Sequence, residues 1–220
     1  KSLPENELRS LIERSEIEAI FYTKKYEDSL KKILEEKVGK LKYLISMEKE
    51  EQELIKKGAD ILPIMSYNSY KLDTKFGKAV EFIKEIEIIT GKKIIHTIQD
   101  AEPIGPKKLT DVMVIAPCSG NTMAKLALDI IDTPVTMAAK SHLRNDRPLV
   151  IAPSTNNGLS GNAENIGKLL NRKNYYFVPF RQDNPITKPR SIVFEEEYLI
   201  KTIEYALEGT QISPILLWFV

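Results

Sequence analysis

Two short runs without a polar side chain restrict the possible folds of this chain most strongly. Residues 112–116 (VMVIA) and 148–152 (PLVIA) are apolar throughout, which is typical of strands buried on both faces of a parallel sheet. Each run leads into a loop of small polar residues and then into a segment with helical spacing of apolar residues. Strands alternating with helices predict a Rossmann-like α/β sandwich, in which helices cover both sides of a doubly wound parallel sheet.

The same alternation is expected along most of the chain. Further strands are expected at residues 19–22, 41–47, 61–65, 135–138 and 175–180. Helices are expected at residues 76–90, 122–131, 162–170 and 195–207, with three more inside residues 4–57. Along residues 76–90, helical spacing places four apolar side chains inward: Val80, Ile83, Ile86 and Ile89. Ligands of such sheets lie beyond the carboxyl ends of the strands, so the loops after Ala116 and Ala152 are the candidate sites.

Charge density divides the sequence near residues 48–57. Residues 1–57 contain 13 Lys or Arg and 13 Asp or Glu, whereas the other 163 residues contain 19 and 18. We therefore expect an atypical N-terminal segment, residues 1–50, and a domain at residues 51–220. The net charge of only +1 argues against a protein that binds nucleic acid by neutralising phosphates.

Cysteine content and hydropathy narrow the class of protein further. A single cysteine excludes an internal disulfide and a cysteine-based zinc site. No apolar run approaches the roughly 20 residues that a membrane span needs. We therefore expect a cytoplasmic protein.

The two loops that follow the apolar runs each allow two interpretations. Residues 117–125 (PCSGNTMAK) enter a helix directly, and their hydroxyls, amides and unpaired N–H groups would suit an anion or a phosphate. The simpler interpretation is that Ser119, Asn121 or Thr122 caps the helix. Residues 153–161 (PSTNNGLSG) could face the same ligand or form only a turn before a cap. Taken alone, each loop is explained more simply by the cap.

Several motifs of known chemistry are missing. Neither a G-x-G-x-x-G fingerprint nor a G-x-x-x-x-G-K phosphate loop occurs. His96 and His142 form no pattern of metal ligands, so no metal is expected, and His96 is expected to line a strand. Cys118 lies just before a helix start, which can lower the pKa of a thiol. No partner for this thiol is visible in the sequence, and no catalytic residue is assigned.

Taken together, the two loops resemble the paired motifs of the flavoprotein family. The resemblance rests on residues 115–127 (IAPCSGNTMAKLA) and 151–156 (IAPSTN). That family includes flavin-dependent cysteine decarboxylases and flavin prenyltransferases, in which the first loop contacts the flavin and the second contributes to the substrate site. The implied contacts with FMN are Pro117, Ser119, Gly120, Asn121, Thr122 and Lys125. The implied substrate contacts are Pro153, Thr155 and Asn156.

A narrower resemblance within the family covers residues 55–217 and points to the B subunits of dipicolinate synthases. Five motifs occur in the same order and spacing: residues 59–67, 73–77, 101–106, 137–140 and 176–180. This resemblance implies an oxidoreductase subunit that acts with an NADPH-binding A subunit during sporulation, on a dihydrodipicolinate-type substrate. It also implies a homo-oligomer, because relatives often build flavin sites between subunits. Two alternatives stay open: an FMN-dependent decarboxylase or prenyltransferase, and a non-catalytic partner of the A subunit.

The chain departs from the family in two places. The decarboxylases carry a catalytic histidine shortly before the strand that ends at Ala116, and residues 101–108 contain none. The family also begins with a strand and a Gly/Thr/Ser-rich phosphate loop, whereas residues 48–53 here read EKEEQE, whose carboxylates would repel a phosphate. Residues 3–46 instead resemble a fragment of an AMP-forming acyl-CoA synthetase without its ATP loop. We interpret the chain as a B-subunit domain whose first strand and loop are replaced, and we expect weakened flavin affinity.

Overall fold

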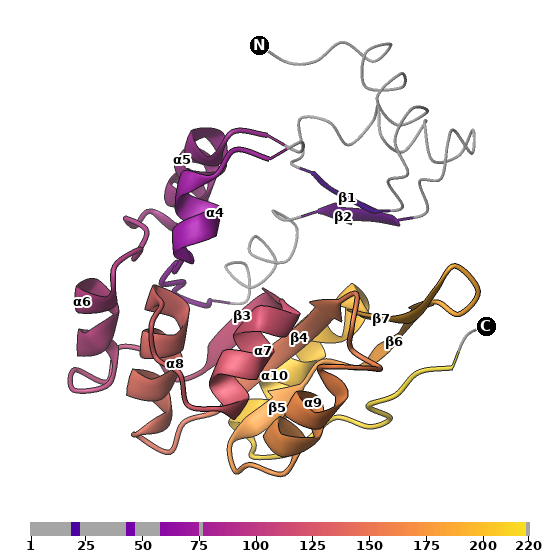
Figure 1. The fold of residues 1–220 in the computed structure, drawn as a ribbon. Coiled ribbons are helices and arrows are strands. Elements are labelled where there is room, and N and C mark those ends of the chain that lie inside the picture. Colours follow the sequence, from indigo (N-terminus) through magenta and orange to yellow (C-terminus); the bar gives the residue numbers. More distant parts are fainter. Residues whose placement is uncertain (1–18, 23–42, 47–57, 75–76, 219–220) are drawn as a thin grey trace. The chain divides into compact units, whose positions relative to one another are not determined.

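The computed structural model of this chain describes residues 19–22, 43–46, 58–74 and 77–218. The chain forms two compact units (Figure 1). The first unit comprises Lys1–Ile61 and Leu72–Gly91, and the second comprises Leu62–Lys71 and Lys92–Val220. The helices expected within residues 4–57, and nearly all of the acyl-CoA synthetase-like stretch, lie outside the described residues.

In the first unit, two short strands pair in parallel. β1 (Ala19–Tyr22) and β2 (Tyr43–Ser46) lie in register, with Ala19 opposite Tyr43 and Tyr22 opposite Ser46. They confirm the strands expected at residues 19–22 and 41–47.

The same unit contains the helix α5 (Ala79–Thr90), which confirms the helix expected at residues 76–90. A carboxylate oxygen of Asp73 accepts the N–H of Ala79 at 2.9 Å, so an acidic side chain satisfies a donor at the helix start. Gly91 ends the helix in the left-handed conformation, with φ of 67°. The inward orientation expected for Val80 is wrong, since this side chain is 51% exposed.

The second unit is built on a five-stranded sheet. β3 (Met113–Cys118), β4 (Leu149–Thr155) and β5 (Tyr175–Phe177) are parallel, with β4 in the middle. β7 (Lys188–Phe194) pairs antiparallel with the end of β4, and β6 (Phe180–Asn184) pairs antiparallel with β7. The expected Rossmann-like α/β fold with a parallel sheet is confirmed, and β6 and β7 extend it in a way that the sequence did not predict.

A tight turn produces this antiparallel extension. Oδ1 of Asn184 accepts the N–H groups of Ile186 and Thr187 at 2.9 and 2.8 Å, which reverses the chain between β6 and β7. The single strand expected at residues 175–180 is divided between β5 and β6. Pro179 lies between them and has no N–H to continue a ladder.

Helices cover both faces of the sheet (Figure 1). α7 (Gly120–Ala127), α8 (Pro134–Leu143) and α9 (Ala163–Leu170) lie on one face, and α10 (Leu199–Leu207) lies on the other. Between them, the first four residues of β4 are completely buried. Burial of each large aliphatic side chain in such a strand contributes about 1.5–3 kcal/mol to folding, so β4 forms the centre of the core.

Three of these helices were expected. α7 confirms the helix expected at residues 122–131, although it begins at Gly120 and ends at Ala127. α9 and α10 confirm those expected at residues 162–170 and 195–207, and a short 3-10 helix (Glu196–Tyr198) precedes α10.

Two expected strands are absent from the second unit. The strand expected at residues 135–138 is wrong, because these residues lie within α8. Thr133 and Thr136 form a reciprocal capping box there, and Pro134 occupies the first helical turn, where its missing N–H costs nothing. At residues 61–65 the expected strand is reduced to one isolated bridge between Ile64 and Ile95.

Short helices surround that bridge and were not expected from the sequence. α4 (Tyr67–Lys71) follows Ile64, and α6 (Ile98–Ala101) follows Ile95. A 3-10 helix (Glu102–Ile104) then leads towards β3. The apolar pattern of each of these helices covers too few residues to be distinguished from a turn in the sequence.

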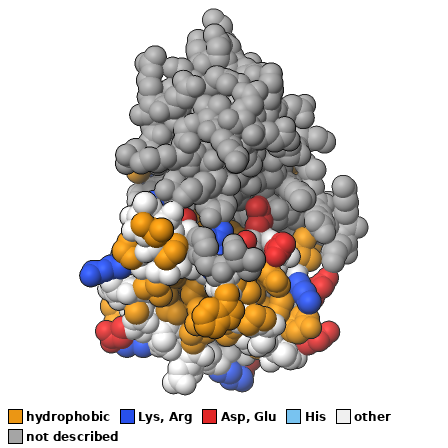
Figure 2. Space-filling view, turned by 90° about the vertical axis from the view of Figure 1, so that its right-hand side faces the viewer, with side chains coloured by type: hydrophobic (Ala, Val, Ile, Leu, Met, Phe, Trp, Pro, Cys, Tyr) orange, Lys and Arg blue, Asp and Glu red, His pale blue; other side chains and the backbone are white. Residues whose placement is uncertain are grey.

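Hydrophobic side chains gather on the face of the second unit that is turned to the viewer in Figure 2. Among the exposed large hydrophobic residues are Ile186 in the β6–β7 turn and Leu216 and Trp218 in the C-terminal segment, at 89%, 63% and 88% exposure. That segment pairs with the start of β6 through the N–H and C=O of Phe180. Among the described residues, no helix has the length and hydrophobicity needed to cross a membrane.

Candidate functional site

Two loops of the second unit meet at one edge of the sheet. β3 and β4 are parallel neighbours with Cys118 opposite Pro153, so their carboxyl ends lie at the same edge. The loop after β3 enters α7, and the loop after β4 leads to α9. These two helices pack against each other on one face of the sheet (Figure 1). The position expected for the two loops, at the same edge of the sheet, is confirmed.

The start of α7 combines a cap with open hydrogen-bond donors. Ser119 is the N-cap, and its hydroxyl oxygen accepts the N–H of Thr122 at 3.3 Å. The helix-cap interpretation is therefore confirmed for Ser119. The N–H groups of Gly120 and Asn121, in the first turn, have no acceptor within the helix. Gly120 is buried and Asn121 is exposed, so the N–H of Asn121 is the one at the positive end of the helix dipole that a ligand oxygen can reach.

A hydrogen-bonded junction connects the loop after β4 with the start of α7. Oγ1 of Thr155 donates to Oδ1 of Asn157 at 2.7 Å, and Nδ2 of Asn162 donates to the same oxygen at 2.8 Å. A Cβ atom on Gly120 would lie 2.5 Å from Nδ2 of Asn162, 2.6 Å from Oγ1 of Thr155 and 2.9 Å from Oδ1 of Asn157. Only glycine fits at this position without displacing its neighbours, so the two loops are in direct contact.

The other residues proposed from the two motifs differ in accessibility. Pro117 and Asn121 are exposed on the first loop. On the second loop Pro153 is buried, Thr155 is half-buried and Asn156 is exposed. The structure therefore brings Asn121, Thr155 and Asn156 to the same edge with accessible polar atoms, whereas Pro153 shapes the loop from below.

The two loops themselves contain almost no charge, although Ser191, whose hydroxyl lies 3.5 Å from Oδ1 of Asn156, also contacts Asp183, which is paired with Lys188. No ionisable side chain other than the thiol of Cys118 occurs in residues 117–122 or 153–163. Lys125, further along α7, directs its ammonium group at both carboxylate oxygens of Asp132, at 2.7 and 2.8 Å. Its charge is thus shared with a carboxylate partner. The two loops therefore present neutral donors and acceptors, and the N–H groups at the helix start can receive a carbonyl, carboxylate or phosphate oxygen.

Cys118 does not provide a nucleophile. Its side chain is completely buried, and burial raises the pKa of the thiol far above its usual value. The expectation of a lowered pKa at the helix start is wrong, because removal of the thiolate from water outweighs the effect of the nearby helix dipole.

Both histidines are held by contacts within the fold. His96 does not line a strand as expected, and its ring instead stacks on that of Tyr70 with centroids 3.8 Å apart. His142 is buried, with Nδ1 2.8 Å from Oγ1 of Thr110 and Nε2 2.8 Å from the carbonyl oxygen of Pro148. Within the part of the chain that the structure describes, no group of three or more His, Cys, Asp or Glu side chains could hold a metal ion.

Sequence comparison connects this geometry with known proteins. A model of the Flavoprotein family matches residues 45–200. This chain belongs to the flavoprotein family. It is 46% identical to the dipicolinate synthase B subunit of Bacillus subtilis over 165 residues, which are 75% of this chain and 82% of that protein. Both the family resemblance and the narrower resemblance to B subunits are therefore confirmed.

This flavoprotein-family chain spans nearly all of one further relative and less than half of another. The crystal structure of the dipicolinate synthase B subunit from Bacillus halodurans has a TM-score of 0.72 at 38% identity, covering 91% of this chain and 95% of that one. The coenzyme A biosynthesis bifunctional protein CoaBC of Thermococcus kodakarensis is 29% identical over 169 residues, covering 73% of this chain but only 40% of that protein.

Sequence reasoning missed two residues at this edge of the flavoprotein-family domain. Asn157 and Asn162 were not identified, although both belong to the junction beneath Thr155. In the run NNGLSGN, residues 156–162, each amide is as compatible with a solvated turn as with a buried network. The sequence signal that could have indicated this junction was Gly120, a residue without a side chain inside an otherwise polar capping motif.

Proposed function

We propose that this chain acts as the B subunit of a dipicolinate synthase. In this proposal it works with an NADPH-binding A subunit in the cytoplasm of a sporulating bacterium, and the reaction is a two-electron oxidation of a dihydrodipicolinate-type substrate to dipicolinate, with the oxidised nicotinamide cofactor or the flavin as electron acceptor. The observation that supports it most is the 46% identity to the Bacillus subtilis B subunit over 82% of its length.

The proposal includes FMN as the cofactor. The predicted contacts are Pro117, Ser119, Gly120, Asn121, Thr122 and Lys125. The neutral N–H groups at the start of α7 fit carbonyl oxygens of a flavin ring, which would supply the redox chemistry when bound. For the phosphate these loops offer only backbone and side-chain donors, because they contain no cation and Lys125 is engaged by Asp132. This supports the expectation that flavin affinity is weakened without the family's first phosphate loop.

The substrate is proposed to lie beside the second loop, against Pro153, Thr155 and Asn156. A dihydrodipicolinate-type molecule carries two carboxylates and a ring nitrogen. The amide of Asn156 and open backbone N–H groups can donate to carboxylates, and the hydroxyl of Thr155 can accept from a donor. These residues would bind and orient the substrate, since none of them titrates near neutral pH.

A non-catalytic role is the second candidate, and one observation favours it. The two loops contain no side chain that could act as a general acid or base near neutral pH, and the thiol of Cys118 is held protonated by burial. In that case the chain would bind and stabilise the A subunit, which would carry all the chemistry. The missing histidine in residues 101–108 speaks against the decarboxylase alternative.

An oligomer is also proposed. The exposed apolar side chains of Ile186, Leu216 and Trp218 support it, because exposed hydrophobic patches commonly mark subunit contacts. Light scattering after size-exclusion chromatography would test it. A change of Trp218→Ser should shift the mass towards the monomer, and an unchanged mass would contradict a contact at this surface.

Reconstitution of both subunits tests the proposed function. The A subunit would be assayed for dipicolinate with wild-type chain, with Asn121→Ala, and with Asn171→Ala as a control at the exposed end of α9. We expect activity to require both subunits and to fall at least about tenfold with Asn121→Ala only, as for loss of a ligand contact. Full activity with Asn121→Ala would favour the non-catalytic role. Full activity of the A subunit alone would contradict both.

A further inference from the structure

The strand β7 runs beside the second loop of the candidate site. Ile192 pairs antiparallel with Thr155 at the end of β4, so the residues of β7 before Ile192 extend past the carboxyl end of that strand. A Cβ atom on Gly158 would lie 2.4 Å from Cγ1 of Ile192, so the loop packs directly on β7. The N–H of Leu159 also donates to the carbonyl oxygen of Arg190 at 3.0 Å. This backbone hydrogen bond holds Arg190 against the loop at the candidate edge.

The side chain of Arg190 projects from the face of β7 that Thr155 shares. Side chains alternate along a strand, so Arg190 and Ile192 project from one face, and Thr155 lies on it as the partner of Ile192. Ser191 is buried on the opposite face, where its hydroxyl donates to Asp183 at 3.3 Å. Diagonal neighbours across an antiparallel pair are about 7–8 Å apart, a distance that an extended arginine side chain can span. The guanidinium of Arg190 can therefore reach the accessible side of Thr155.

Arg190 is also the cation of β6 and β7 whose charge is not shared with a carboxylate. Arg181 forms an ion pair with Glu195. Lys188 forms one with Asp183, at 3.1 Å. Arg190 is exposed, and among the residues that the structure describes no carboxylate lies within ion-pair distance of its guanidinium. Its N–H donors are therefore available to an anion from outside the chain.

We propose that Arg190 binds one carboxylate of the substrate and determines the preference of the site for a dicarboxylic acid. The inference rests on the proposed function, and it supplies the cation that the two loops lack. A planar guanidinium donates two parallel N–H groups to one carboxylate, which gives both charge and direction to the contact. The proposed substrate carries two carboxylates, so the second one is left to the neutral donors of the loops.

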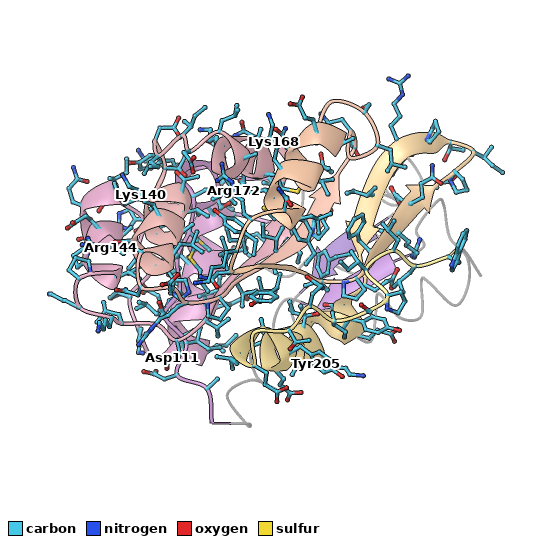
Figure 3. All side chains as sticks on the ribbon, turned by 90° about the horizontal axis from the view of Figure 1, so that it is seen from below. Asp111, Lys140, Arg144, Lys168, Arg172 and Tyr205 are labelled. Atoms are coloured by element: carbon cyan, nitrogen blue, oxygen red, sulfur yellow. The ribbon has the colours of Figure 1, made fainter. Side chains whose placement is uncertain are left out.

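Two pyridine acids separate a carboxylate contact from a general effect of charge. Dipicolinate, the stable product of the proposed reaction, and picolinate, the same ring with one carboxylate, would be titrated by calorimetry at a fixed ionic strength. The variants are Arg190→Gln, Arg190→Lys and the matched control Arg144→Gln. Arg144 (labelled in Figure 3) is also exposed, and it lies at the end of α8, before β4 begins, and so belongs to the opposite edge of the sheet. Circular dichroism would verify that each variant is folded.

Wild type and Arg144→Gln should bind dipicolinate at least about tenfold more tightly than picolinate, because only the diacid fills both carboxylate positions. Arg190→Gln should reduce this ratio below about threefold. Arg190→Lys should give an intermediate ratio, since an ammonium group keeps the charge without the planar fork. An undiminished ratio in folded Arg190→Gln, or wild type that binds neither acid, would overturn the proposal.

A titration with FMN distinguishes a carboxylate from the flavin phosphate as the anion that Arg190 meets. Arg190→Gln should bind FMN within about twofold of wild type, because the proposed flavin contacts belong to the first loop. A loss of FMN affinity with an unchanged ratio of the two acids would assign the guanidinium to the phosphate and overturn the proposal.

Reconstitution with the A subunit makes failure of the inference distinguishable from failure of the proposed function. In the dipicolinate assay, Arg190→Gln should raise KM for the substrate at least about tenfold and leave kcat within about threefold of wild type. Active wild type with an unchanged KM in Arg190→Gln would overturn the inference alone. Inactive wild type whose preference for dipicolinate still depends on Arg190 would overturn the proposed function and leave Arg190 as a contact for dicarboxylic acids.

Discussion

Replacement of Gly120 by alanine should destabilise the protein, in contrast to the usual effect of this change in a helix. The added Cβ would lie 2.5, 2.6 and 2.9 Å from polar atoms of Asn162, Thr155 and Asn157. These atoms are held to one another by hydrogen bonds of 2.7 and 2.8 Å, so they cannot all retreat without losing a bond. Overpacking of this kind costs about 1–3 kcal/mol. A weakened hydrogen bond adds about 0.5–1.5 kcal/mol.

The higher helix propensity of alanine offsets at most about 1 kcal/mol of this. The expected net loss in the free energy of unfolding is therefore about 1–3 kcal/mol, measured by urea denaturation followed by circular dichroism. Gly167→Ala is the matched control, because Gly167 lies in α9 and a Cβ there would meet no atom within 4 Å. That variant should gain about 0.5–1 kcal/mol. If Gly120→Ala gained as much as Gly167→Ala, the packing of the two loops described above would be refuted.

Three further predictions concern stability and reactivity. Burial lowers the pKa of His142 below its ordinary value of 6.5, so the unfolded chain binds a proton that the folded protein resists. The contribution of neutral His142 to the free energy of unfolding is complete above pH 6.5 and is lost as the pH falls below that value. In urea titrations at decreasing pH, the free energy of unfolding should therefore fall, and it should fall less steeply for His142→Gln. An equally steep fall for wild type and His142→Gln would contradict this. Arg172 (labelled in Figure 3) donates to the carbonyl oxygens of Leu126 and Ala127 and to Asp129. Arg172→Leu should cost about 1–2 kcal/mol in urea denaturation, allowing for partial exposure, with Arg172→Lys recovering less than half. Cys118 should not react with a thiol reagent in the native protein at pH 8 and should react in urea, because burial raises its pKa; fast native labelling would disprove its burial.

The sequence by itself determined the class of the fold and the place of the candidate site. The apolar runs at residues 112–116 and 148–152 favour burial, and they became the parallel neighbours β3 and β4, of which β4 is the fully buried centre of the sheet and β3 ends the described strand order. The capping residue Ser119 was also among the candidates, since a serine before a helix carries its local hydrogen bond with it. These features depend on local chemistry or on hydrophobic pattern, which the order of residues encodes directly.

Only the tertiary structure decided features that depend on partners distant in the chain. The run at residues 135–138 is not such a case: the capping box of Thr133 with Thr136, only three residues apart, favours α8, and this local signal was missed in the sequence. The pKa of the Cys118 thiol is raised because surrounding elements bury it, and its position just before α7 does not reveal this burial.

The candidate site shows the same division. Asn157 and Asn162 meet Gly120 across 37 and 42 positions of sequence, and no local pattern states that these residues share one junction. The motif therefore predicted which loops hold the polar groups. Packing of α7 against the loop after β4 decided which of those groups are already paired and which remain open to a ligand, because hydrogen-bond partners are assigned in space and not along the chain.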